Sequence, residues 1–106
     1  MALNDNEVYA RLRARYCDRL ACELLVLQER SHALGDEMDP GFRHALCAQA
    51  HALAGSGGTF GFPSVSAAAA ALEDALRRNA DISIIAAAAQ QLMRVMATAA
   101  NDDARD

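Results

Sequence analysis

The apolar residues of this chain recur every three or four positions, the spacing that places side chains on one face of an α-helix. Four such stretches follow one another, separated by short segments that contain glycine, asparagine or aspartate. No stretch alternates apolar and polar residues as a half-buried strand does. The pattern therefore predicts an all-α protein. The residues expected to face its core are Val8, Leu12, Tyr16, Leu20, Leu24 and Leu27 in the first helix, Phe42, Leu46, Ala50 and Leu53 in the second, Val65, Ala69, Leu72 and Leu76 in the third, and Ile85, Ala89, Leu92 and Met96 in the fourth.

Residues that favour helix ends place the boundaries of these four helices. Short polar side chains accept hydrogen bonds from the first N–H groups of a helix, and proline has no N–H to leave unpaired there. The predicted starts are residues 4–5 for the first helix, Asp39-Pro40 for the second, Pro63 for the third and Asp81 for the fourth. The glycine-rich segment 55–63 must contain the break between the second and third helices. Because the connections are short, we expect an antiparallel, up-down four-helix bundle.

The length and composition fit one globular domain. The chain of 106 residues is 53% hydrophobic and 23% charged, a balance typical of folded proteins. Its net charge is −4, and its ten basic residues are all arginine. The densest arginine stretch, residues 11–19, is interleaved with apolar residues and indicates a solvated helix face. We therefore expect residues 1–106 to form a single domain that does not bind nucleic acid, which needs clustered positive charge.

Other sequence features indicate where the protein acts. Met1 is soon followed by the polar run Asn4-Asp5-Asn6-Glu7, so we expect no signal peptide. The alanine runs 67–71 and 86–89 are interrupted well before the ~18 apolar residues that a membrane-spanning helix needs. The cysteines at 17, 22 and 47 form no CxxC pair, which favours reduced thiols. Since no long heptad seam indicates an obligate coiled-coil dimer, we expect a cytoplasmic monomer that binds no membrane.

His51 is the residue with the clearest chemical potential. At about 100° per residue it lies nearly opposite the predicted core face of the second helix, so it should face water. Its neighbours one turn away, Cys47, Ala48, Ala54 and Gly55, are all small, which leaves room for another protein to reach the ring. A neutral imidazole is a competent nucleophile near pH 7 and can accept a phosphoryl group. The alternative is an ordinary exposed histidine in an alanine-rich helix.

The segment 50–62 reads AHALAGSGGTFGF, and Ala71-Leu72-Glu73 follow one helix later. This combination resembles the signature of histidine-containing phosphotransfer (HPt) domains, and GTFGF is especially similar to the phosphotransfer domain of chemotaxis histidine kinases. The resemblance implies that His51 accepts a phosphoryl group from a receiver-domain aspartate, or from a sensor histidine kinase, and passes it to another response regulator. It also implies that the domain has neither kinase activity nor a cofactor of its own, and that the partner receiver supplies Mg²⁺.

The resemblance further implies roles for individual residues. Glu73 stands 22 residues after His51, where the chemotaxis-kinase domains place a glutamate that hydrogen-bonds the phosphorylatable imidazole. The alternative for Glu73 is a surface ion pair with Arg77. Gly55 matches the small residue that lets a receiver approach the ring. From the geometry of the second helix, the expected receiver contacts are Cys47, Ala48, Ala52, Ala54, Gly55 and Ser56.

One position departs from the family pattern. Many members carry lysine three residues after the histidine, whereas this chain has Ala54 there and no lysine anywhere. Arg43 and the pair Arg77-Arg78 are the nearest substitutes for the missing charge. The departure favours an alternative function, a helical interaction module that binds receivers or kinases without phosphotransfer. A second alternative, suggested by GTFGF, is a kinase-type phosphotransfer domain that an ATP-binding domain phosphorylates in trans.

Overall fold

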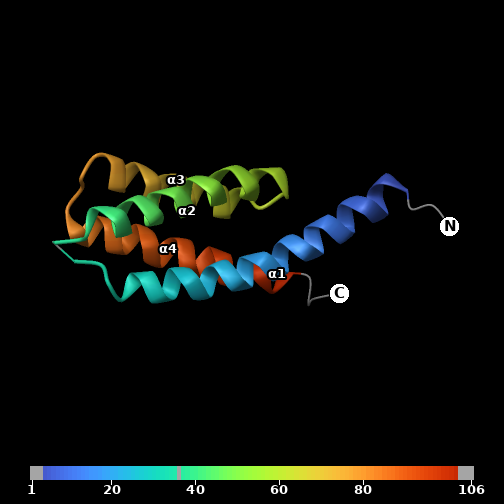
Figure 1. Ribbon diagram of the computed structural model, residues 1–106. Coiled ribbons are helices and arrows are strands. Elements are labelled where there is room, and N and C mark those ends of the chain that lie inside the picture. Colours follow the sequence, from blue (N-terminus) through green and yellow to red (C-terminus); the bar gives the residue numbers. More distant parts are fainter. Residues whose placement is uncertain (1–3, 36, 103–106) are drawn as a thin grey trace.

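The structure is a computed structural model that describes residues 4–35 and 37–102. Four helices make up most of these residues. They are α1 (Asp5–Ser31), α2 (Pro40–Thr59), α3 (Pro63–Arg77) and α4 (Ile82–Ala100). Successive helices run in opposite directions, and α2 and α3 lie on one side with α4 and α1 on the other (Figure 1). The expected all-α, up-down four-helix bundle is confirmed.

The helices begin at the capping residues that the sequence indicates. The side-chain oxygen of Asn4 accepts a hydrogen bond of 2.8 Å from the N–H of Glu7, and its amide nitrogen donates to the Glu7 carboxylate at 3.2 Å. The Asp39 carboxylate accepts from two N–H groups of the first turn of α2. Asp81 is the N-cap residue of α4, although its side chain makes no capping hydrogen bond. Local side-chain chemistry therefore sets the starts of α1 and α2.

The glycine-rich segment continues α2 by one further turn before the chain reverses. The helix ends at Thr59, and Gly61 adopts φ +82°, the left-handed conformation that glycine reaches without strain. The N–H of Phe62 donates to the Gly57 carbonyl at 2.7 Å, and that of Gly61 to the Gly58 carbonyl at 3.3 Å. These two bonds form a Schellman motif, which satisfies carbonyls at the end of α2. The break predicted within residues 55–63 therefore falls at residues 60–62.

The buried core follows the predicted faces of α2, α3 and α4, but not the whole predicted face of α1. Leu20 and Leu27 are fully buried, whereas Val8 and Leu12 are 42% and 44% exposed. The prediction was wrong for these two residues because an i, i+4 row rotates about 40° around the helix at each step. A row that faces the core at Leu20 has turned away from it at Leu12 and Val8. The first turns of α1 also extend past the α2–α3 turn (Figure 1).

Polar side chains join α1 to α2. The amide of Gln49, a buried residue, donates to the carbonyl and the carboxylate of Glu23 at 3.2 and 3.0 Å. Its oxygen accepts from Arg30 at 2.7 Å. The hydroxyls of Tyr16 and Ser56 share a hydrogen bond of 2.7 Å. Burial raises the pKa of Tyr16, and the bond to Ser56 opposes that rise. These directional bonds fix the rotation of α2 about its own axis.

α4 is the one helix of the described residues that is long and apolar enough to cross a membrane, with 19 residues and a mean hydropathy of 1.3. The alanine runs alone did not predict this, because isoleucine, leucine and methionine raise the mean more than a single charge, Arg94, lowers it. α4 packs between α3 and α1, and its side chains Ile85, Leu92 and Met96 are fully buried in the bundle. Its apolar face thus forms part of the core of the bundle.

Candidate functional site around His51

His51 projects from the outer face of α2, opposite the buried side chains of the same helix. Its side chain is 72% exposed. Around it, Ala48, Ala52 and Gly55 are exposed, and Cys47 is half-buried. Because none of these neighbours has a long side chain, the imidazole is open to a molecule that approaches α2 from solvent.

Glu73 of α3 holds the ring from one side. Its Oε2 lies 2.8 Å from Nδ1 of His51, and its side chain is 14% exposed. The two helices pack closely enough for this contact because Gly57 presents no side chain to α3, where an added Cβ would lie 3.0 Å from the backbone nitrogen of Ser66. Glu73 thus reaches the ring across the interface between α2 and α3.

Arg77 shares the same carboxylate oxygen. Its Nε and Nη2 atoms donate to Oε2 of Glu73 at 3.0 and 2.7 Å. Arg77 lies one turn after Glu73 on α3, so the pair has the i, i+4 spacing at which helix side chains meet. Both interactions considered for Glu73 from the sequence, the bond to the imidazole and the ion pair with Arg77, are therefore present together.

These contacts determine the chemical state of the pair. The hydrogen bond from Arg77 lowers the pKa of Glu73, burial raises it, and the hydrogen bond from His51 lowers it further, so that the net shift is downward. Glu73 is consequently ionised near neutral pH, and an ionised carboxylate only accepts hydrogen bonds. The proton of a neutral His51 ring must then sit on Nδ1, which leaves the lone pair on Nε2.

A shallow hollow lies beside the ring. It has a volume of about 330 Å³ and is lined by His44, Cys47, Ala48, His51 and Arg77. His51 and Arg77 therefore border one open space, which has room for a small anion.

Three of the six expected receiver contacts, Cys47, Ala54 and Ser56, are half-buried. Ser56 is half-buried, with its hydroxyl on Tyr16. Ala54 is half-buried, and its carbonyl accepts a hydrogen bond of 2.6 Å from the hydroxyl of Ser66. The sequence did not predict this bond. Its only indication is that a serine, Ser66, stands in an alanine-rich helix. The remaining three, Ala48, Ala52 and Gly55, are exposed.

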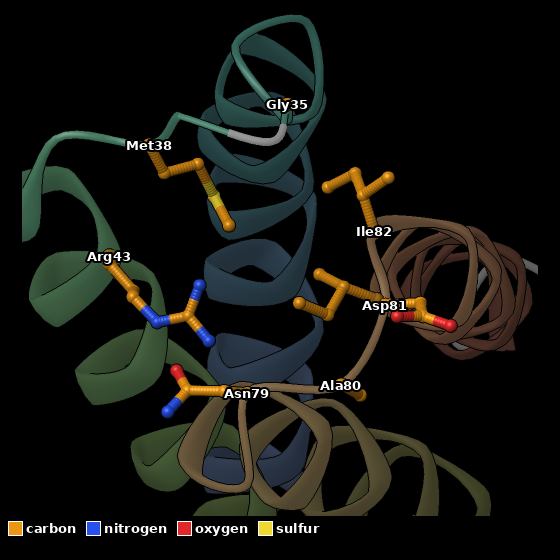
Figure 2. Close-up of a pocket in the computed structure, with 8 residues that line it drawn as sticks. Gly35, Met38, Arg43, Asn79, Ala80, Asp81 and Ile82 are labelled. Atoms are coloured by element: carbon orange, nitrogen blue, oxygen red, sulfur yellow. The ribbon is translucent and has the colours of Figure 1, made fainter.

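The other arginines suggested by the sequence are engaged elsewhere. Nη2 of Arg43 donates to the Leu76 carbonyl at 2.6 Å. Figure 2 shows Arg43 extending above Asn79 into a separate cavity of about 270 Å³ between the two loops at the other end of the bundle. Arg78 pairs with Asp74, and both side chains are largely exposed. Of the candidate cations, Arg77 is the one that shares a partner with His51.

No group of three or more His, Cys, Asp or Glu side chains is arranged to hold a metal ion within residues 4–35 and 37–102. The chemistry that the described residues offer at this site is that of an exposed, oriented imidazole beside a carboxylate and a guanidinium.

Comparison with protein families matches the chain to the model of the Hpt domain over residues 17–103. The matched region contains His51, Glu73 and Arg77, together with all of α2, α3 and α4. Comparisons with curated proteins and with solved structures gave no significant match.

Proposed function

Because the chain belongs to the Hpt domain family, whose members act in histidine phosphotransfer in two-component signalling, we propose that it is a phosphorelay intermediate. His51 accepts a phosphoryl group from a receiver-domain aspartate and passes it to another response regulator. The observation that carries this proposal is the exposed His51 ring, which Glu73 holds through Nδ1 at 2.8 Å so that Nε2 is the nucleophile.

The transfer requires no general base from this chain, because the attacking nitrogen carries no proton. The Nε2 lone pair attacks the phosphorus of the aspartyl phosphate. An N–P bond forms while the bond from phosphorus to the aspartate oxygen breaks, and its electron pair leaves on the aspartate carboxylate. The proton remains on Nδ1, so the phosphorylated ring gains a positive charge that faces the carboxylate of Glu73. In-line positioning of donor and ring lowers the barrier to this transfer.

We infer that the partner receiver supplies the Mg²⁺ that neutralises the phosphoryl oxygens, and that this domain contributes no cofactor. The receiver docks on the face of α2 that surrounds His51. Cys47, Ala48, Ala52 and Gly55 provide small side chains there, and the edge of the contact reaches Ala54 and Ser56. A surface with few long side chains allows the aspartyl phosphate to come within bonding distance of the ring, which suits a transient interface.

We further infer the setting in which this domain works. Hpt domains interact with receiver domains and histidine kinases in general, so the partners are response regulators, a sensor histidine kinase, or both. Residues 1–106 act as one domain in the cytoplasm and as a monomer, without nucleic acid or a membrane. The net charge of −4 supports the expectation that the domain does not bind nucleic acid. The packing of α4 between α3 and α1 supports the expectation that it does not enter a membrane.

Transfer from a phosphorylated receiver tests the proposal. A set of purified receiver domains, each phosphorylated on its aspartate, is mixed with the chain in Mg²⁺, and acid-labile phosphohistidine is measured. We expect label on the wild type and none on His51→Gln. Gly55→Gln should slow transfer from the receiver, because a long side chain then stands beside the ring, while labelling by the small donor phosphoramidate stays near wild type.

The same experiment separates the interaction module from the phosphotransfer protein. The observation in favour of the interaction module is Ala54, which brings no positive charge to the site. A wild-type chain that binds a phosphorylated receiver as tightly as His51→Gln does, and remains unlabelled, would contradict phosphotransfer and support the interaction module. Label that arrives only from a kinase with ATP would instead identify a kinase-type phosphotransfer domain.

A further inference from the structure

Phosphorylation of His51 creates an electrostatic problem at this site. The phosphoryl group carries close to two negative charges at neutral pH, and it is attached to a ring whose other nitrogen already faces the carboxylate of Glu73 at 2.8 Å. Position 54, one turn along α2, carries alanine and offers no compensating charge. The positive charge that the ring gains on phosphorylation offsets only part of this negative charge, so a cation from another element would stabilise the adduct.

Arg77 is placed to supply it. Its Nη2 atom and Nδ1 of His51 contact the same oxygen of Glu73, at 2.7 and 2.8 Å, so guanidinium and ring are separated by one shared atom. The Arg77 side chain is 65% exposed and lines the same hollow as the ring. Within the described residues its Nη1 atom makes no hydrogen bond, which leaves this atom to donate to a second anion while Nε and Nη2 stay on Glu73.

We propose that Arg77 is the phosphoryl-binding residue of this domain. The inference rests on the proposed phosphotransfer function. In the unphosphorylated protein, Arg77 pairs with Glu73. Once an N–P bond forms at Nε2, the guanidinium bridges Glu73 and a phosphoryl oxygen, since its planar set of N–H donors can meet two anions at once. Arg77 of α3 then provides the charge that α2 lacks at Ala54.

The lifetime of the phosphohistidine adduct tests this role. The wild type, Arg77→Ala, Arg77→Lys and Arg78→Ala are labelled with phosphoramidate and Mg²⁺, the donor is removed, and loss of the adduct is followed by intact mass. We expect Arg77→Ala to lose the adduct about threefold to tenfold faster than wild type, the scale of one partly exposed charge contact. Arg77→Lys should recover most of the lifetime. Arg78→Ala is the matched control, because it removes a neighbouring arginine that pairs with Asp74, and it should behave as wild type.

A second comparison distinguishes direct contact from an effect through Glu73. In a Glu73→Gln background, Arg77→Ala should still shorten the adduct's lifetime by about threefold or more, because the contact with the phosphoryl group does not require the carboxylate. Equal lifetimes for Glu73→Gln and the double variant, or equal losses for Arg77→Ala and Arg78→Ala, would overturn the proposal and leave phosphotransfer intact. A wild-type chain that takes up no label would overturn both.

Discussion

The carboxylate of Glu73 links the other two residues of the proposed phosphotransfer site, His51 and Arg77. One oxygen, Oε2, accepts from Nδ1 of His51 and from two nitrogens of Arg77. The arginine keeps Glu73 ionised, and the ionised carboxylate in turn keeps the ring proton on Nδ1. In the proposed transfer, Glu73 thus selects Nε2 of His51 as the nucleophilic nitrogen.

The lowered pKa of Glu73 makes a testable contribution to the pH dependence of stability. A carboxyl group whose pKa is lower in the folded state stabilises the fold fully above its ordinary value of 4.5, and that stability is lost as the pH falls through the lowered folded-state pKa. We expect the difference in melting temperature between wild type and Glu73→Gln to be constant near neutral pH and to shrink below about pH 4.5.

Melting curves from pH 7 to pH 3 would measure this difference. Asp74→Asn is the matched control, because Asp74 also forms an i, i+4 pair with an arginine but is 74% exposed, and an exposed pair contributes little. A melting-temperature difference between wild type and Glu73→Gln that grows as the pH falls would contradict a stabilising, ionised Glu73.

The sequence identified the residues of this site more completely than their contacts. His51 was found from its place opposite the core face of the second helix, and Glu73 from the resemblance to the chemotaxis-kinase domains. The spacing of Arg77 from Glu73 allowed an ion pair. Sequence alone could not show that one oxygen serves both partners, because that depends on the distance between α2 and α3. Likewise, the partly buried placement of Ser56 depends on Tyr16, forty residues away.

At the scale of the helices, two glycines of α2 have opposite surroundings. A Cβ added at Gly57 would lie 3.0 Å from the Ser66 nitrogen and 3.3 Å from the Phe62 carbonyl oxygen, both of which are backbone atoms. A Cβ added at Gly55 would meet nothing within 4 Å. Gly57 is therefore required for the approach of α3, whereas Gly55 costs helix stability and leaves space next to His51.

We expect Gly57→Ala to destabilise the fold by about 1–3 kcal/mol, because backbone must move to admit the methyl group. Gly55→Ala should stabilise it by about 0.5–1 kcal/mol through the higher helix propensity of alanine. Chemical denaturation of both variants alongside wild type checks the pair. A Gly57→Ala protein at least as stable as wild type would contradict the close packing of α2 on α3.

The helix boundaries were predictable, since they depend on local chemistry. Asn4 and Asp39 cap their helices with side-chain oxygens, and the turn between α2 and α3 falls at residues 60–62, where Gly61 takes a positive φ. The buried face of α1 was less predictable, because several rows of apolar residues follow the same helix. Only the positions of α2 and α4 decide which of these rows faces the core.

The orientation of α1 leads to a further test. We expect Val8→Ala and Leu12→Ala to change the free energy of unfolding by no more than about 0.5 kcal/mol, since both side chains are exposed. Leu20→Ala removes a fully buried side chain and should cost about 2–5 kcal/mol. Denaturant unfolding of the three variants measures these values. A decrease of about 2 kcal/mol in the free energy of unfolding of Leu12→Ala would contradict the exposure of this side chain.

The domain as a whole is elongated, with extents of 55 × 21 × 20 Å. The first turns of α1 extend beyond the turn between α2 and α3, and α2 and α3 lie together on the opposite side of the bundle from α1 and α4 (Figure 1). The proposed phosphotransfer site is confined to α2 and α3, which carry His51, Glu73 and Arg77. α4 and the buried part of α1 form the support against which these two helices are held.

Phosphorylation by a small donor tests whether His51 is the phosphoryl acceptor, and it requires no partner protein. The wild type and His51→Gln are incubated with phosphoramidate and Mg²⁺, and their intact masses are compared, with a known phosphotransfer domain labelled in parallel. We expect one acid-labile phosphoryl adduct on the wild type and none on the variant. A folded wild-type protein that stays unmodified while the known domain is labelled, or an adduct that persists in His51→Gln, would contradict the assignment of His51 as the phosphoryl acceptor.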